Sequence, residues 1–102
     1  MRHFLFALFF SLVLCPAIYA DDPLQTGVII HRKYKMKEVE REIPYTLYLP
    51  KNYDGTKETP VLFALHGLFS DCYQIIRYPG IVPAAEKNNF ILVAPMGYNN
   101  QG

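Results

Sequence analysis

An unbroken apolar run from Val61 to Leu65 constrains the fold of this chain more than any other segment. Pro60 precedes the run and His66-Gly67 ends it, so it is too short for a globular helix and is typical of a strand. Apolar side chains on both faces of a strand indicate a parallel sheet that helices cover on each side. We therefore predict a strand buried on both faces in an α/β fold, with functional residues just beyond its carboxyl end.

The first twenty residues differ in composition from the rest of the 102-residue chain. A basic start is followed by an apolar stretch from Phe4 to Leu14 and by small residues up to Ala20. This pattern indicates a secretory signal peptide over residues 1–20. An uncleaved membrane anchor is the alternative, but the apolar stretch is shorter than the roughly 20 residues of a spanning helix. We predict a secreted or periplasmic protein that has no membrane contact after cleavage, with its domain over residues 21–102.

The charge balance of the mature chain argues against nucleic-acid binding. Removing Arg2 leaves nine of the ten basic residues, and nine acidic residues balance them. A neutral surface has no electrostatic footprint for nucleic acid. The basic and acidic residues between Arg32 and Glu42 alternate closely enough to indicate a solvated strand edge or hairpin.

The sequence contains no pattern for a metal or a cofactor. There is no Gly-rich phosphate loop and no His, Cys or carboxylate spacing that suits a metal, so we expect neither. Cys72 is the one cysteine that remains after cleavage. It is either a free thiol or bonded to a partner outside this chain, and the sequence leaves that choice open.

The remaining elements follow from periodicity and turn residues. Residues 27–34 have strand composition, and residues 43–49 alternate as a half-buried strand does, so the two are expected to pair antiparallel. Pro44 should lie at a sheet edge or outside the ladder. A crossover helix between residues 71 and 89 should be interrupted at Tyr78-Pro79-Gly80 and end at Asn88 or Asn89. The apolar run 90–94 then forms a strand parallel to Val61–Leu65.

Two stretches of sequence resemble a known family. LYLPKNYDGTKETPVLFALHG and, further along, AAEKNNFILVAPMGYN are similar to the amino-terminal part of secreted α/β-hydrolases. The resemblance covers Glu42 to Gly102 and is strongest to esterases similar to polyhydroxybutyrate depolymerases and to feruloyl or acetylxylan esterases. It implies an incomplete α/β-hydrolase sheet, made of an antiparallel strand pair and a strand-helix-strand parallel unit. It also implies an ester substrate, either a small molecule or linked to a polymer, and no cofactor.

The resemblance also implies a role for the loop after the apolar strand. In this family that loop supplies one main-chain N–H of the oxyanion hole, and the residue after the nucleophile supplies the other. By position the donor here is Leu68, with Phe69 next, in a dry surround that strengthens it. Gly67 would let the backbone turn, and His66 would hold the loop's shape. His66 is not expected to be the catalytic base, since the order serine, acid, histidine places the base near the carboxyl terminus.

The sequence departs from the family in lacking a nucleophile elbow. No G-x-S-x-G motif is present, and Ser70, the one serine of the mature chain, has no glycine two residues before or after it. Asp71 is better explained as a helix cap than as a triad acid. Cys72 has no histidine placed beside it as a base. We therefore expect the nucleophile, acid and base beyond Gly102, and no activity from this segment alone.

Two functional hypotheses follow. In the first, the chain is the amino-terminal piece of a secreted serine esterase. A prolyl-peptidase-like or lactone hydrolase of the same fold is the alternative within this hypothesis. In the second, it is a complete, non-catalytic secreted module that pairs through its exposed strand edge. Reading the coding DNA past codon 102 separates the two. The sequence leaves the particular substrate and the oligomeric state open.

Overall fold

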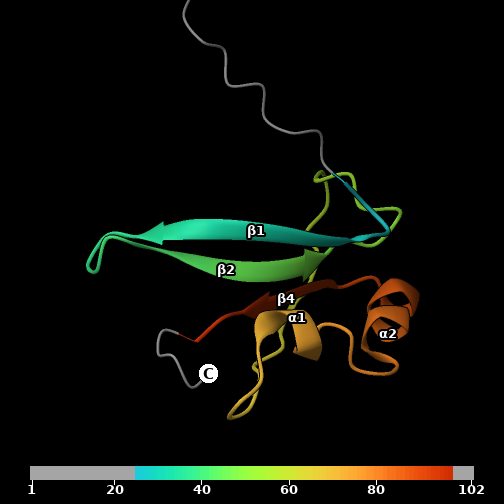
Figure 1. Ribbon diagram of the computed structural model, residues 1–102. Coiled ribbons are helices and arrows are strands. Elements are labelled where there is room, and N and C mark those ends of the chain that lie inside the picture. Colours follow the sequence, from blue (N-terminus) through green and yellow to red (C-terminus); the bar gives the residue numbers. More distant parts are fainter. Residues whose placement is uncertain (1–24, 98–102) are drawn as a thin grey trace, which may run out of the picture.

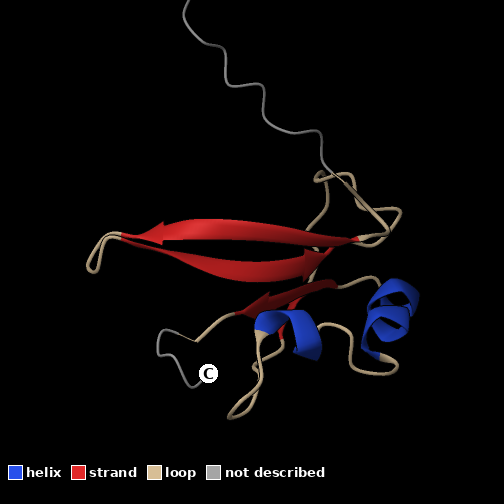
Figure 2. Ribbon diagram, in the orientation of Figure 1, coloured by secondary structure: helices blue, strands red, loops and turns tan. Residues whose placement is uncertain are grey.

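The computed structural model describes residues 25–97, which form a four-stranded sheet with two helices packed on one face (Figures 1 and 2). The elements in chain order are β1 (Ile29–Met36), β2 (Arg41–Tyr48), β3 (Val61–Phe63), α1 (Cys72–Ile75), α2 (Ile81–Asn88) and β4 (Ile91–Pro95). The strand order in the sheet is β1-β2-β4-β3. The predicted signal peptide lies outside the described residues. Within residues 25–97 no helix has the length and apolarity to cross a membrane.

β1 and β2 form the antiparallel hairpin that the sequence predicts. Their register pairs Ile29 with Tyr48 at one end and Met36 with Arg41 at the other, so both strands run further into the charged segment than expected. Across the hairpin, the ammonium of Lys33 lies 3.6 Å from a carboxylate oxygen of Glu42, and both side chains are exposed. Exposed pairs of this kind contribute little to stability. The charged run is thus the solvated end of a hairpin, as predicted.

β2 is buried on both faces, whereas its alternating sequence predicts a half-buried strand. Thr46 and Tyr48 face the helices and are buried, with Thr46 completely inaccessible. On the opposite face Ile43 is buried, as is Leu49 directly after the strand. The reason is the place of β2 in the sheet. It lies between β1 and β4, and the helices pack over its even-numbered positions.

The predicted position of Pro44 is wrong. Pro44 lies inside β2 and is paired with Lys33, rather than at a sheet edge or outside the ladder. Its carbonyl oxygen accepts a hydrogen bond from the N–H of Met96 at 3.1 Å, so the main chain of Pro44 faces β4. The N–H and C=O of a strand residue point to the same side, so the N–H that proline lacks would also have faced β4 and not β1. The pairing with β1 therefore loses no hydrogen bond at Pro44.

β3 and β4 pair in parallel, as predicted, with Val61 opposite Ile91 and Phe63 opposite Val93. The predicted burial of the apolar run is wrong. β3 has only three residues, and Val61, Phe63 and Leu65 are 48%, 65% and 73% exposed. In the described part of the chain β3 is an edge strand, with β4 as its one neighbour, and the helices pack against β2 and β4 instead. Within residues 25–97 Ala64 is the one buried member of the run, and its other four side chains are exposed.

The crossover between β3 and β4 is interrupted where the sequence predicts. Asp71 caps α1, since its carboxylate accepts the N–H of Gln74 at 2.7 Å, and this bond lowers the pKa of Asp71. The segment at Tyr78–Gly80 is not helical and separates α1 from α2. Asn89 ends α2 in the left-handed conformation, with a φ of 53°. Both helices cover one core against β2 and β4. Its buried members are Tyr48, Ala64, Cys72, Ile76, Ala85, Leu92 and Ala94.

Candidate functional site

The carboxyl ends of β3 and β4 bring two distant loops together at one edge of the sheet. The strands are parallel, so both chains leave the sheet in the same direction. The N–H of Ala64 donates to the carbonyl of Val93 at 2.8 Å, which carries the pairing one residue beyond β3. The segment from His66 to Ser70 then emerges beside Met96 and Gly97. In α/β sheets this edge is where ligands bind.

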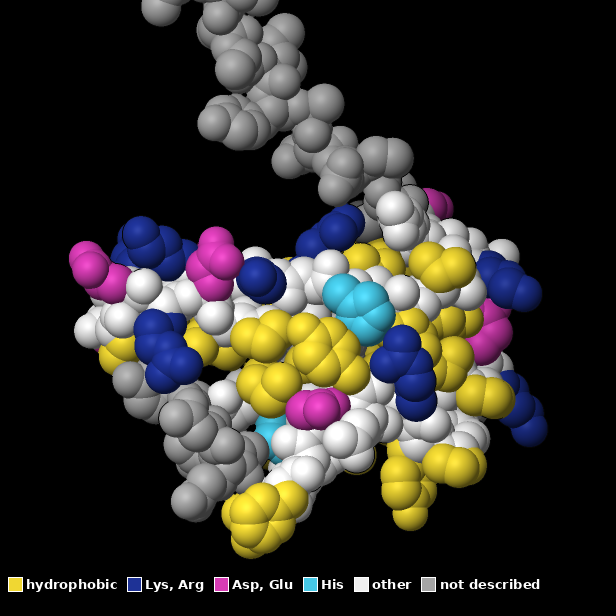
Figure 3. Space-filling view, in the orientation of Figure 1, with side chains coloured by type: hydrophobic (Ala, Val, Ile, Leu, Met, Phe, Trp, Pro, Cys, Tyr) yellow, Lys and Arg dark blue, Asp and Glu magenta, His cyan; other side chains and the backbone are white. Residues whose placement is uncertain are grey.

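Residues Gly67 to Ser70 form a tight turn. The N–H of Ser70 donates to the carbonyl of Gly67 at 3.2 Å, and Phe69 has a positive φ of 59°, whereas Leu68 does not. A positive φ at the third residue alone is the signature of a type II turn. The turn projects from the lower edge of the molecule in Figure 1, and Figure 3 shows hydrophobic side chains at its tip.

The two predicted oxyanion donors are the central residues of this turn. Within residues 25–97, neither Leu68 nor Phe69 donates its main-chain N–H to another residue. Their side chains are 68% and 81% exposed. The dry surround that the sequence predicts is therefore absent among the described residues. Their role as donors stays a prediction, based on the position and free amides of the turn.

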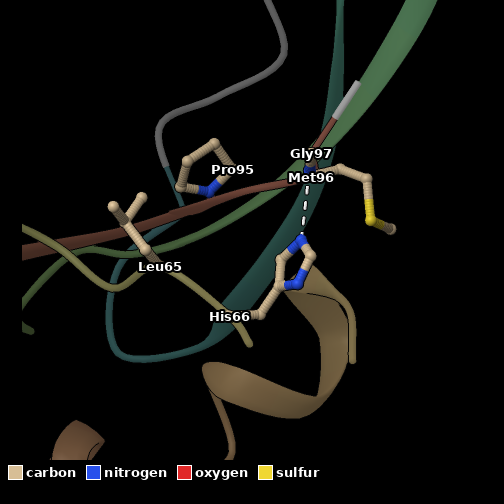
Figure 4. A pocket seen from close by; sticks show the side chains of 5 residues that line it. All are labelled: Leu65, His66, Pro95, Met96 and Gly97. Atoms are coloured by element: carbon tan, nitrogen blue, oxygen red, sulfur yellow. Dashed lines mark hydrogen bonds between the residues drawn. The ribbon is translucent and has the colours of Figure 1, made fainter. Parts of the chain in front are cut away.

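His66 connects the two loops. Its Nδ1 lies 3.0 Å from the carbonyl oxygen of Gly67, and its Nε2 accepts the main-chain N–H of Gly97 at 3.1 Å (Figure 4). The ring is half-buried. It lines a pocket of about 250 Å³ together with Leu65, Pro95 and Met96. His66 thus holds the first residue of the turn on one side and the end of β4 on the other.

None of the other described polar side chains near the turn is placed as an activated nucleophile or a free acid. Asp71 is occupied as the cap of α1. Cys72 is a free, fully buried thiol, and burial followed by the charge of Asp71 raises its pKa. A raised pKa disfavours the thiolate, which is the nucleophilic form. Ser70 is half-buried, and no base lies in hydrogen-bond contact with its hydroxyl among the described residues.

The remaining histidine of the described region, His31, is exposed on β1. Its ring packs against that of Tyr73, with the centroids 5.2 Å apart. β1 lies at the opposite edge of the sheet from β3, the strand that leads into the turn. Between residues 25 and 97 no group of three or more histidine, cysteine or acidic side chains is placed to hold a metal.

The sequence and the structure define a member of an esterase family with part of an α/β-hydrolase sheet. The family described as "Putative esterase" matches residues 36–102, which is more than half of the chain. The chain belongs to this family. A comparison with curated protein sequences found no match.

Several solved structures share the fold. A CE1 ferulic acid esterase from Anaeromyces mucronatus, AmCE1/Fae1A, solved in complex with ferulic acid, is 26% identical with a TM-score of 0.61, over 85% of this chain and 35% of that one. FphF, a fluorophosphonate-binding serine hydrolase from Staphylococcus aureus, is 25% identical with a TM-score of 0.57, over 72% of this chain and 31% of that one. The S-formylglutathione hydrolase FrmB from the same bacterium is 25% identical with a TM-score of 0.57, over 74% and 34%. The chain thus spans about a third of the length of these structures.

Sequence reasoning placed the loop but missed its connection to β4. The contact between His66 and Gly97 joins residues 31 positions apart, and no local motif marks it. Parallel pairing of the two strands was the one available signal, since it brings the residues after each strand to the same edge. The positive φ of Phe69 was missed as well, because an aromatic residue is not typical of that conformation.

Proposed function

We propose that the whole protein is a secreted carboxylic-ester hydrolase, and that the described residues supply one half of its oxyanion hole. The observation that carries this proposal is the turn at Gly67–Ser70. It stands at the carboxyl edge shared by β3 and β4, and the main-chain N–H groups of Leu68 and Phe69 have no acceptor among the described residues. Membership of the esterase family supports an ester as the substrate.

The proposed chemistry is acyl transfer through a serine. The serine oxygen gives its proton to the base and attacks the ester carbonyl carbon, and the carbonyl electron pair moves onto oxygen. The N–H of Leu68, or of Phe69, donates to that negative oxygen together with the N–H of the residue after the nucleophile. The carbon–oxygen bond to the alcohol then breaks as the base returns its proton, and water releases the acid by the same steps. The nucleophile, acid and base are proposed to lie beyond Gly102.

A proline substitution tests the donor directly. Proline has no N–H, and its fixed φ suits the second residue of a type II turn, so Leu68→Pro removes the donor while it preserves the turn. Hydrolysis of p-nitrophenyl acetate by the whole protein should lose roughly a hundred- to a thousandfold in kcat, as for other lost oxyanion donors. Leu68→Ala is the matched control. It keeps the N–H and removes only an exposed side chain, so kcat should change little.

Two further measurements test the wider proposal. A fluorophosphonate probe should label a serine of the whole protein other than Ser70, whereas residues 21–102 alone should give no turnover above buffer. Labelling of Ser70, or turnover that Ser70→Ala abolishes, would contradict the assignment of the nucleophile. Wild-type kcat in folded Leu68→Pro would contradict the oxyanion role of that N–H. A stop codon directly after codon 102 would favour a non-catalytic module.

A further inference from the structure

The two hydrogen bonds of His66 determine where its proton lies. The partner of Nε2 is the main-chain N–H of Gly97, which can only donate, so Nε2 must accept and carry no proton. The partner of Nδ1 is the carbonyl of Gly67, which can only accept, so Nδ1 carries the proton. Both contacts are made only by a neutral imidazole protonated on Nδ1.

We infer that His66 is a positioning residue that holds the proposed oxyanion turn in place only as the neutral, Nδ1-protonated imidazole. This inference rests on the proposed function of the turn. The ring touches neither Leu68 nor Phe69 through a hydrogen bond, and acts through the residues on either side of the site. It fixes the carbonyl of Gly67, where the turn begins, and it ties that point to Gly97 beyond β4.

Protonation of His66 breaks this arrangement. A proton on Nε2 would face the N–H of Gly97 at 3.1 Å, so two donors would oppose each other and the link to the β4 side would be lost. Asp71, from the start of α1, interacts electrostatically with His66, whereas Pro95, Met96 and Gly97 on the β4 side do not titrate. Only the tautomer with a bare Nε2 can therefore join the turn to the β4 side.

Two substitutions separate positioning from simple packing. His66→Gln carries an amide oxygen that can accept the N–H of Gly97 and does not titrate. His66→Phe keeps a planar ring of similar size and has no acceptor. If the inference is right, kcat for p-nitrophenyl acetate should fall about tenfold in the phenylalanine variant, which corresponds to one lost hydrogen bond with its donor left unpaired. The glutamine variant should recover most of that loss.

His31→Gln is the matched control, because His31 is exposed on β1, the strand at the opposite edge of the sheet from β3. It should leave kcat unchanged. Equal kcat values for the glutamine and phenylalanine variants of His66 would overturn the inference.

Nitrogen NMR of the whole protein tests the tautomer without any enzyme assay. In protein labelled with ¹⁵N-histidine, the signals that disappear in His66→Gln identify this ring. At neutral pH they should show a protonated Nδ1 and a bare Nε2, and a proton on Nε2 would refute the inference. If the protein hydrolyses no ester but the tautomer is as stated, the proposed function fails and the coupling of His66 to Gly97 stands.

Discussion

The hydroxyl of Thr46 is predicted to hold α1 against the sheet. It is completely inaccessible, and it donates to the carbonyl of Cys72 at 2.8 Å, which joins β2 to the first residue of the helix that follows the turn. Thr46→Val replaces the hydroxyl with a methyl group of similar size. The substitution removes the hydroxyl donor, so the buried carbonyl of Cys72 loses its hydrogen bond from β2.

The expected cost follows from burial. A hydrogen bond between neutral groups contributes about 1 kcal/mol net, and an unsatisfied buried partner raises the cost of its loss to about 1–3 kcal/mol. The extra methyl group offsets part of this through its own burial. We therefore expect a loss of about 1–2 kcal/mol in the free energy of unfolding.

Urea denaturation of the whole protein, followed by circular dichroism, measures this loss. Thr59→Val is the matched control, because the Thr59 hydroxyl donates to the carbonyl of Lys57 at 3.1 Å in an exposed contact. Its cost should stay within about 0.5 kcal/mol, as for other surface substitutions. Equal stability of the two variants would refute the claim that the buried contact anchors α1.

Two further predictions concern buried titratable groups. Burial, and then the neighbouring carboxylate of Glu86, raise the pKa of Tyr48 to about 12 from 10.0. The raised pKa belongs to the folded state, so the stability that Tyr48 adds over Tyr48→Phe should be complete below pH 10 and lost as the pH rises to about 12. Urea midpoints of the two proteins measured across this pH range test this, and a difference in midpoint that does not change with pH would contradict it. The thiol of Cys72, whose pKa burial raises, should react slowly with Ellman's reagent in native protein and rapidly in urea, and equal rates would show that it is accessible.

Local signals in the sequence predicted much of the fold. Asp71 begins α1 through its side chain, and Asn89 ends α2 through its left-handed backbone conformation. The type of residue at each position was therefore enough to locate these two helix ends. The antiparallel and parallel strand pairs also followed from periodicity and connection length. Each of these features depends on residues close together in the chain.

Features that depend on distant neighbours could not be read in the same way. The apolar side chains of Val61–Phe63 indicate a strand that can be buried, but its exposure is decided by which elements pack beside it. Thr46 is a polar residue whose burial depends on the carbonyl of Cys72, and sequence gives no sign of that partner. The site shows the same division. The loop from His66 to Phe69 was located by the strand before it, whereas its tie to Gly97 required the three-dimensional arrangement.

Phe69 is held against two physical preferences at once. Its backbone occupies the left-handed region, which costs a residue with a Cβ roughly 1–2 kcal/mol and which glycine would occupy freely. Its aromatic ring is 81% exposed, so within the described residues it gains almost no hydrophobic burial in return. Selection for folding alone would favour glycine at this position. Strained residues of this kind cluster at functional sites, and the conformation of Phe69 therefore agrees with the role proposed for this turn.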